Sequence, residues 1–242
     1  MPIAAVLFDK DGTLIDFDKT WGPATYAVIH ALAGGDAAAM RRQADMLHFS
    51  LETRRFHLTS PLIAGSSASY GRMWGDALGR SDYEALKLEI DALNAVESLN
   101  SLTPIGRPAE VLAALKSRGL RLGVATNDSE ASARRQVKAM QLDEQLDFIV
   151  GYDSGHGGKP APGMILAFAR HVGVSPGEVA MVGDTTHDLR AARAAGAVAI
   201  AVLTGPAAIE DLAADADHVL DDIGALPELI DRLARAPVAA GD

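Results

Sequence analysis

Near its start the chain reads Ala4-Ala5-Val6-Leu7-Phe8-Asp9-Lys10-Asp11-Gly12-Thr13-Leu14. The apolar run before Asp9 is typical of a buried strand, whose carboxyl end would deliver Asp9 and Asp11 into a site. Both carboxylates would be ionised at neutral pH, so placing them together requires a cation, and hard oxygen ligands favour Mg²⁺. A strand followed by an ordinary Asp-Gly turn explains the same residues equally well. Residues further along the chain have to decide between these two interpretations.

The composition limits the class of protein. The chain has 242 residues, of which 48% are hydrophobic, so it can bury a sizeable core as one large domain or two small ones. Its formal net charge of −10 argues against a general nucleic-acid binder. A phosphorylated substrate stays possible, because a metal ion and a few basic side chains can reverse the sign of the charge within one site.

The chain contains no cysteine. This excludes disulfides, cysteine-ligated zinc, iron–sulfur clusters and thiol nucleophiles, and it fits a reducing cytoplasm. The residues before Asp9 lack the charged and apolar regions of a signal peptide, and no apolar run approaches the ~20 residues needed to cross a bilayer. We therefore expect a cytoplasmic protein with no membrane partner.

Beyond about residue 104 the sequence alternates between two kinds of segment. Short apolar runs predict strands at 120–125, 148–150, 179–182, 197–203 and 218–220. Between and around them, helices are predicted at 108–118, 130–140, 162–172, 189–195, 207–213 and 225–235. Such alternation predicts an α/β fold with a parallel sheet covered by helices on both faces. Ligands of these folds bind outside the carboxyl ends of the strands.

The segment from residue 16 to residue 103 has a different pattern. Helices are indicated at 21–32, 37–49 and 83–99, without convincing strands between them, and residues 61–74 read as a broken or loop-like part. We therefore predict an all-helical domain at 16–103, inserted into a core domain made of residues 1–15 and 104–242.

Polar residues follow four elements of the predicted core. Asp9 and Asp11 follow the first strand, and Thr126 and Asn127 follow the strand at 120–125; the other two positions are Gly157-Gly158-Lys159-Pro160, before a helix, and Gly183-Asp184-Thr185-Thr186-His187-Asp188, after a strand. In a parallel sheet all four would meet at one edge. Phosphoryl transfer needs such a set: a carboxylate nucleophile, a second acid, a metal site, a lysine and a hydroxyl.

In order and spacing these motifs resemble those of the haloacid dehalogenase-like hydrolases over essentially the whole chain. The resemblance implies a Rossmann-like three-layer core, an inserted helical cap domain and Mg²⁺-dependent hydrolysis of phosphomonoesters. It implies that Asp9 is the nucleophile and Asp11 the general acid and base, and that Asp9, Asp11 (through its backbone carbonyl) and Asp184 ligate Mg²⁺. Asp188 would ligate the metal directly or hold a metal-bound water.

The same resemblance implies phosphate binding by Thr126 and Lys159, with Asn127 beside them. Asp11 favours a phosphatase over a dehalogenase, because only the phosphatases of this family need an acid two residues past the nucleophile. Within the family the closest resemblance is to phosphoglycolate phosphatase-like enzymes.

The sequence thus predicts a phosphatase acting on a small phosphorylated metabolite similar to phosphoglycolate, as a monomer or homodimer. One alternative is a phosphotransferase that moves phosphate between positions of a sugar, as in relatives similar to β-phosphoglucomutase. The other is a regulatory protein that binds a ligand and catalyses nothing.

Overall fold

The computed structural model describes residues 2–63 and 70–235. The chain divides into two compact units. Met1–Ile15 and Pro104–Asp242 form the core unit, and Asp16–Thr103 form the inserted unit. Each unit has its own hydrophobic core.

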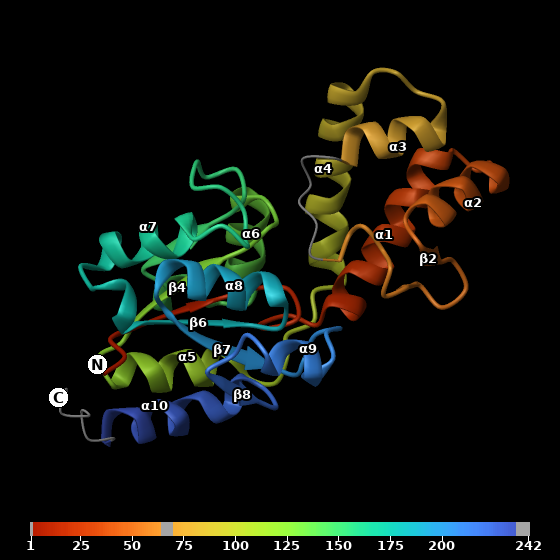
Figure 1. The fold of residues 1–242 in the computed structure, drawn as a ribbon. Coiled ribbons are helices and arrows are strands. Elements are labelled where there is room, and N and C mark those ends of the chain that lie inside the picture. The colour runs from red at the N-terminus through yellow and green to blue at the C-terminus, as the bar shows by residue number, and fades with distance from the viewer. Residues whose placement is uncertain (1, 64–69, 236–242) are drawn as a thin grey trace. The chain divides into compact units, whose positions relative to one another are not determined.

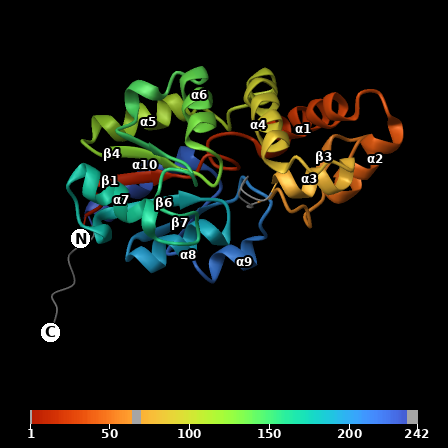
Figure 2. The ribbon, with the colours of Figure 1, turned by 90° about the horizontal axis from the view of Figure 1, so that it is seen from above.

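Over the described residues, the core unit contains a six-stranded sheet in the order β5-β4-β1-β6-β7-β8. All the strand pairs are parallel, which confirms the predicted α/β class. The bounds are Ala5–Phe8 for β1, Arg121–Ala125 for β4, Phe148–Val150 for β5, Val179–Gly183 for β6, Val198–Val202 for β7 and His218–Leu220 for β8. Figure 2 shows β1 between β4 and β6, so the strand that leads to Asp9 is central.

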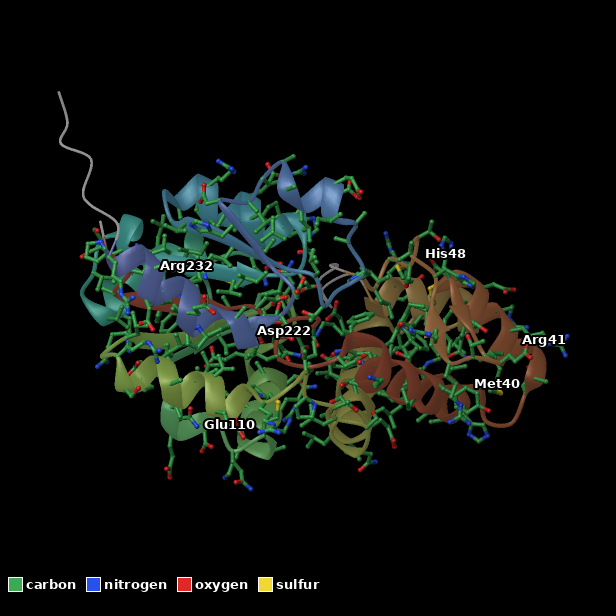
Figure 3. All side chains as sticks on the ribbon, turned by 90° about the horizontal axis from the view of Figure 1, so that it is seen from below. Met40, Arg41, His48, Glu110, Asp222 and Arg232 are labelled. Carbon is green, nitrogen blue, oxygen red and sulfur yellow. The ribbon has the colours of Figure 1, made fainter. Side chains whose placement is uncertain are left out.

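Alternate side chains of the central strands enter two different cores, as the pleat requires. Val6 and Phe8 of β1 belong to one cluster, and Ala5 and Leu7 belong to the other. The first cluster is covered by helices α5 (Pro108–Ser117), α6 (Glu130–Ala139) and α10 (Leu226–Arg235). Figure 1 shows α5 and α10 side by side, and Figure 3 views them from below, with Glu110 on α5 and Arg232 on α10.

The second cluster is covered by α7 (Gly163–Val172), α8 (Thr186–Ala195) and α9 (Ile209–Ala213). Where α8 packs on β6 and β7, the contact consists largely of alanines. Ala191 and Ala192 of α8 and Ala199 and Ala201 of β7 are all completely buried. The helices therefore form layers on both faces of the sheet, and the chain has the expected three-layer order.

The inserted unit is built mainly from helices. They are α1 (Phe17–Ala33), α2 (Ala37–Met46), α3 (Tyr70–Leu78) and α4 (Tyr83–Asn100). Their apolar faces enclose a third core around Val28, Leu47, Trp74, Leu86 and Ile90. The sequence predicted that the first of these helices begins at residue 21, but α1 begins at Phe17. It begins earlier because the side chain of Asp16 caps it by accepting a hydrogen bond from the N–H of Lys19.

The expectation of helices alone is wrong in one place. Residues Phe49–Ser50 (β2) and Arg55–Phe56 (β3) pair as a short antiparallel hairpin, where the sequence predicted a helix up to residue 49 and no strands. The helix ends before His48, whose positive φ an α-helix cannot contain, and a second positive φ at Arg54 lies in the turn between the two strands. Of the loop-like part predicted at 61–74, residues 70–74 lie in α3, and residues 64–69 lie outside the described residues.

Across residues 2–63 and 70–235, no helix combines the length and the apolar character that a membrane span requires.

Candidate active site

Asp9 lies directly beyond β1, at the carboxyl edge of the sheet. Its N–H donates to the carbonyl of Val182 on β6 at 2.8 Å, so the parallel pairing continues to the candidate nucleophile. The chain then turns sharply, and the N–H groups of Leu14 and Ile15 both donate to the carbonyl of Lys10. Gly12 makes this turn with a φ of +78°, a conformation that favours glycine. The turn leaves the Asp9 side chain 9% exposed.

Lys159 connects Asp9 to a second carboxylate. Its Nζ lies 2.6 Å from an oxygen of Asp9 and 2.6 Å from an oxygen of Asp188, and only 4% of its side chain is exposed. The Asn127 amide fixes the lysine backbone from both sides, since Oδ1 accepts from the Lys159 N–H at 2.8 Å and Nδ2 donates to its carbonyl at 3.0 Å. Burial opposes the charged ammonium, but Asp188 and Asp9 outweigh burial and raise the pKa of Lys159.

Asp184 comes from the turn after β6, and Asp188 comes from the first turn of α8. The sequence predicted a helix from residue 189, but α8 begins at Thr186. It begins earlier because Asp188 closes a capping box with Thr185, whose N–H and hydroxyl both donate to the Asp188 carboxylate, at 3.0 Å and 2.7 Å. The other oxygen of Asp188 pairs with Lys159, so one buried side chain both caps the helix and faces the site.

Asp9, Asp184 and Asp188 form a group that fits a divalent cation. Within the described part of the chain, each offers an oxygen within 4.8 Å of the others, and all three residues are buried. Three carboxylates facing one lysine leave an excess of negative charge. Burial, opposed by Lys159 and reinforced by Asp188 and Asp11, raises the pKa of Asp9 to about 7. Burial and the neighbouring Asp9 also raise the pKa of Asp184. A hard dication such as Mg²⁺ matches this donor set.

The structure places the remaining sequence candidates as follows. Thr126 is buried at the end of β4, and its hydroxyl accepts from the N–H of Asp128 at 3.0 Å. Asn127 is next to Lys159, as expected. The Asp11 carboxylate is not one of the three clustered above; it pairs with Lys10, 2.7 Å away. The resemblance assigns the backbone carbonyl of Asp11, and not its carboxylate, to the metal, so that role stays a prediction.

Several residues around Asp184 were not singled out from the sequence. The Thr13 hydroxyl donates to Asp184 at 3.1 Å, and the Thr204 hydroxyl donates to the carbonyl of Gly12 at 2.6 Å. Gly205 lies so close to Asp184 that a Cβ there would overlap the carboxylate. Thr204 and Gly205 follow a predicted strand, so the rule that ligands bind beyond strand ends could have identified them. The sequence also suggested no role for Lys10, which lies between the two acids of the first motif.

Comparisons with known proteins identify the family of the chain. A family model described as haloacid dehalogenase-like hydrolase matches residues 3–196. A phosphoglycolate phosphatase from Rhodospirillum rubrum is 28% identical over 240 residues, covering 96% of this chain and 96% of the relative. The family and this relative's name support the phosphatase class expected from the sequence.

Two solved structures have the same fold. A hydrolase of this family from Deinococcus radiodurans, with bound phosphate and sodium, has a TM-score of 0.67 at 21% identity over 98% of this chain and 99% of that one. A Thermotoga maritima protein assigned as a β-phosphoglucomutase has a TM-score of 0.69 at 20% identity over 95% and 99%. At identities of 20% and 21%, these similarities show that the fold is shared and say nothing more about function. Since the family model spans most of its length, the chain belongs to the haloacid dehalogenase-like hydrolases.

Proposed function

We propose that this hydrolase is a Mg²⁺-dependent phosphatase that releases phosphate from a small phosphorylated metabolite, with phosphoglycolate as the leading candidate. The observation that carries the proposal is the buried ammonium of Lys159, 2.6 Å from both Asp9 and Asp188 and next to Asp184. A nucleophilic carboxylate placed beside a fixed positive charge is suited to attack a phosphate ester, whose oxygens carry negative charge.

In the first step an oxygen of Asp9 bonds to the phosphorus while the bond from phosphorus to the leaving-group oxygen breaks. The carboxylic acid of Asp11 gives its proton to that oxygen, so an alcohol leaves and an aspartyl-phosphate remains on Asp9. Lys159 and Thr126, with Asn127 beside them, would bind the phosphoryl oxygens. The two hydrogen bonds between the Asn127 side chain and the backbone of Lys159 hold this lysine in place.

In the second step water attacks the phosphorus of the aspartyl-phosphate. The Asp11 carboxylate accepts a proton from that water, the bond between phosphorus and Asp9 breaks, and inorganic phosphate is released. The Asp9 carboxylate and the acid form of Asp11 are then restored for the next cycle.

Mg²⁺ would be held by Asp9, Asp184 and the backbone carbonyl of Asp11, with Asp188 as a direct ligand or the holder of a bound water. When bound, the ion supplies positive charge that stabilises the phosphoryl oxygens. The hydrogen bond from Thr13 and the close contact with Gly205 support this assignment, since both hold Asp184 in one orientation.

The choice of phosphoglycolate is supported by the R. rubrum relative, which carries that name and aligns along nearly the full length of both chains. The inserted unit is the part of the chain that would select the ester, because the residues assigned to the chemistry belong to the core unit. We further propose that the enzyme acts in the cytoplasm.

Replacing the nucleophile tests the proposal. Asp9→Asn should lower the turnover of p-nitrophenyl phosphate in Mg²⁺ by at least about a thousandfold, because the amide cannot form the covalent intermediate. Asp36→Asn is the matched control, since Asp36 only caps α2, a task that asparagine also performs, and its turnover should stay at the wild-type level. Wild-type-like activity of Asp9→Asn would remove Asp9 from the nucleophile role.

Product analysis separates the alternatives. Free phosphate from a sugar phosphate supports a phosphatase, and an isomerised sugar phosphate supports the mutase. A protein that binds phosphate esters only with Mg²⁺ and turns over none of a broad panel would be the regulatory binder.

A further inference from the structure

Lys10 is completely buried between the two acids of the first motif. None of its side chain is exposed, and its Nζ lies 2.7 Å from an oxygen of Asp11 and 3.2 Å from an oxygen of Asp128. Burial disfavours the ammonium, but Asp11 and Asp128 outweigh it and raise the pKa of Lys10, so the residue stays charged. Because it is sealed from solvent, its ammonium cannot contact a substrate.

The two partners of Lys10 come from neighbouring strands. Asp11 follows β1 and Asp128 follows β4, and these strands pair in parallel with Phe8 opposite Val124. Lys10 therefore joins the turn after β1 to the turn after β4. No residue of the cluster formed by Asp9, Asp184 and Asp188 takes part in these two ion pairs.

Asp128 is itself held firmly. Its N–H donates to the Thr126 hydroxyl at 3.0 Å, and its Oδ1 accepts from the N–H of Ser129 at 2.7 Å, while Oδ2 faces Lys10. The Asp11 carboxylate at the other end of the bridge lies on the turn after β1 and is about equally exposed, at 19% against 18% for Asp128. Lys10 thus connects the candidate acid to a carboxylate that the turn after β4 holds in place.

We propose that Lys10 is a positioning residue which, held by Asp128, fixes the Asp11 carboxyl in the orientation from which it protonates the leaving group. This inference rests on the proposed function, in which Asp11 is the general acid. Proton transfer requires the acid within hydrogen-bond reach of the leaving oxygen, so a carboxyl free to rotate would be a poorer donor.

A purely structural bridge between β1 and β4 would behave differently from a positioning residue. Loss of a structural contact lowers the amount of folded enzyme and slows every substrate equally. Loss of acid positioning instead depends on the leaving group. The alkoxide of an alkyl phosphate needs a proton as it departs, whereas p-nitrophenolate is stable without one.

The experiment compares kcat/KM for p-nitrophenyl phosphate with that for an alkyl phosphate, using phosphoglycolate or β-glycerophosphate, whichever the wild type hydrolyses faster. This constant reports the steps up to release of the leaving group. In Lys10→Met the aryl-to-alkyl ratio should rise about tenfold, a part of the hundredfold or more that general acids contribute. Asp128→Asn should move the ratio in the same direction. Asp128 is 18% exposed, whereas Lys10 is completely buried, so Asp128→Asn should disturb folding less. This variant therefore provides the test if Lys10→Met does not fold.

Two further variants make the test specific. In an Asp11→Asn background Lys10→Met should leave the ratio unchanged, since there is no acid left to position. Lys116→Met removes another lysine of the core unit from its carboxylate, Asp147, and should not alter the ratio.

An unchanged ratio in folded Lys10→Met or Asp128→Asn would overturn the inference, as would a ratio change that persists without the Asp11 acid. Failure of the proposed function looks different: the wild type would hydrolyse neither ester, or Asp9→Asn would remain active.

Discussion

Asp184 lies against two glycines from distant parts of the chain, Gly12 and Gly205, and a Cβ at either would overlap its carboxylate. Gly12 also has a positive φ, so a substitution there would change backbone strain together with space. Gly205 is the better position for a test, because its φ lies outside the left-handed region and a substitution there changes space alone. Close contact with backbone, and not charge alone, therefore keeps Asp184 in place.

We predict that Gly205→Ala weakens Mg²⁺ activation. The added methyl group should displace Asp184 and lower turnover at limiting Mg²⁺ by about tenfold to a hundredfold. The measurement is p-nitrophenyl phosphate turnover across a Mg²⁺ titration. Gly119→Ala serves as the control, because a Cβ there would face open space, and the strain of its φ of +82°, about 1–2 kcal/mol, would lower stability without reaching Asp184. Identical Mg²⁺ titrations for the two variants would contradict this account of Asp184.

Among the secondary-structure elements, Asp147 connects α5, β4 and β5. It precedes β5, accepts from the N–H of Leu122 at 2.9 Å, and pairs with Lys116 at 3.2 Å and Arg121 at 3.0 Å. Burial opposes its charge, but these three partners outweigh burial and lower the pKa of Asp147. The carboxylate therefore stabilises the edge of the sheet in its ionised form.

Asp147→Asn should lower the free energy of unfolding by about 1.5–3 kcal/mol at pH 7, the usual value of a hydrogen bond to a charged group. The folded pKa lies below the ordinary 3.8, so this stabilisation is complete above that pH and is lost as the pH falls through the folded pKa. Urea denaturation at pH 7 and pH 3 measures the difference, which should shrink at pH 3. Asp221→Asn, at an exposed carboxylate, is the control; an equal effect of Asp147→Asn at both pH values would show that its charge is not involved.

At the scale of the whole molecule, the chain leaves and re-enters the core unit at adjacent points. Ile15 forms a bridge with Pro104, and the N–H of Ile105 donates to the carbonyl of Leu14 at 2.9 Å. The first and last residues of the inserted unit are also adjacent, since the N–H of Asp16 donates to the carbonyl of Thr103 at 2.8 Å. A short linker could therefore replace the whole insertion.

We predict that the core unit folds when residues 16–103 are replaced by a few glycines and serines. Its sheet has apolar clusters of its own on both faces, and Asp9, Lys159, Asp184 and Asp188 all belong to it. The shortened protein should melt cooperatively by circular dichroism and hydrolyse p-nitrophenyl phosphate, with less discrimination between alkyl phosphates. A chain that aggregates or shows no cooperative melting would contradict this independence.

The sequence predicted the sheet well because buried parallel strands are short, continuous apolar runs, as at 5–8 and 179–182. It placed the start of α8 wrongly, because the same Asp188 that looked like part of a site motif also closes a capping box. The β2–β3 hairpin was missed because its strands have only two residues each, too few to show an alternating pattern.

For the candidate site, the motifs predicted Asp9, Lys159 and Asp184 but not the contacts among them. That Lys159 bonds to both Asp9 and Asp188, or that Lys10 reaches Asp128, depends on which strands are neighbours and on how far side chains extend. Gly205 belongs to none of the motifs recognised in the sequence. It matters only because the chain folds it against Asp184.

The alanines beneath α8 have a consequence for the charged site. Asp188 projects from the first turn of this helix, so its reach toward Lys159 depends on how near the helix lies to β6 and β7. The distance between packed elements is set by the side chains between them, and here these include Ala192 and Ala199. Because each alanine side chain is a single methyl group, the helix can lie close to the sheet. We expect a bulkier residue at either position to move α8 away from the sheet and to lengthen the ion pair between Asp188 and Lys159, so apolar residues outside the candidate site would affect its geometry.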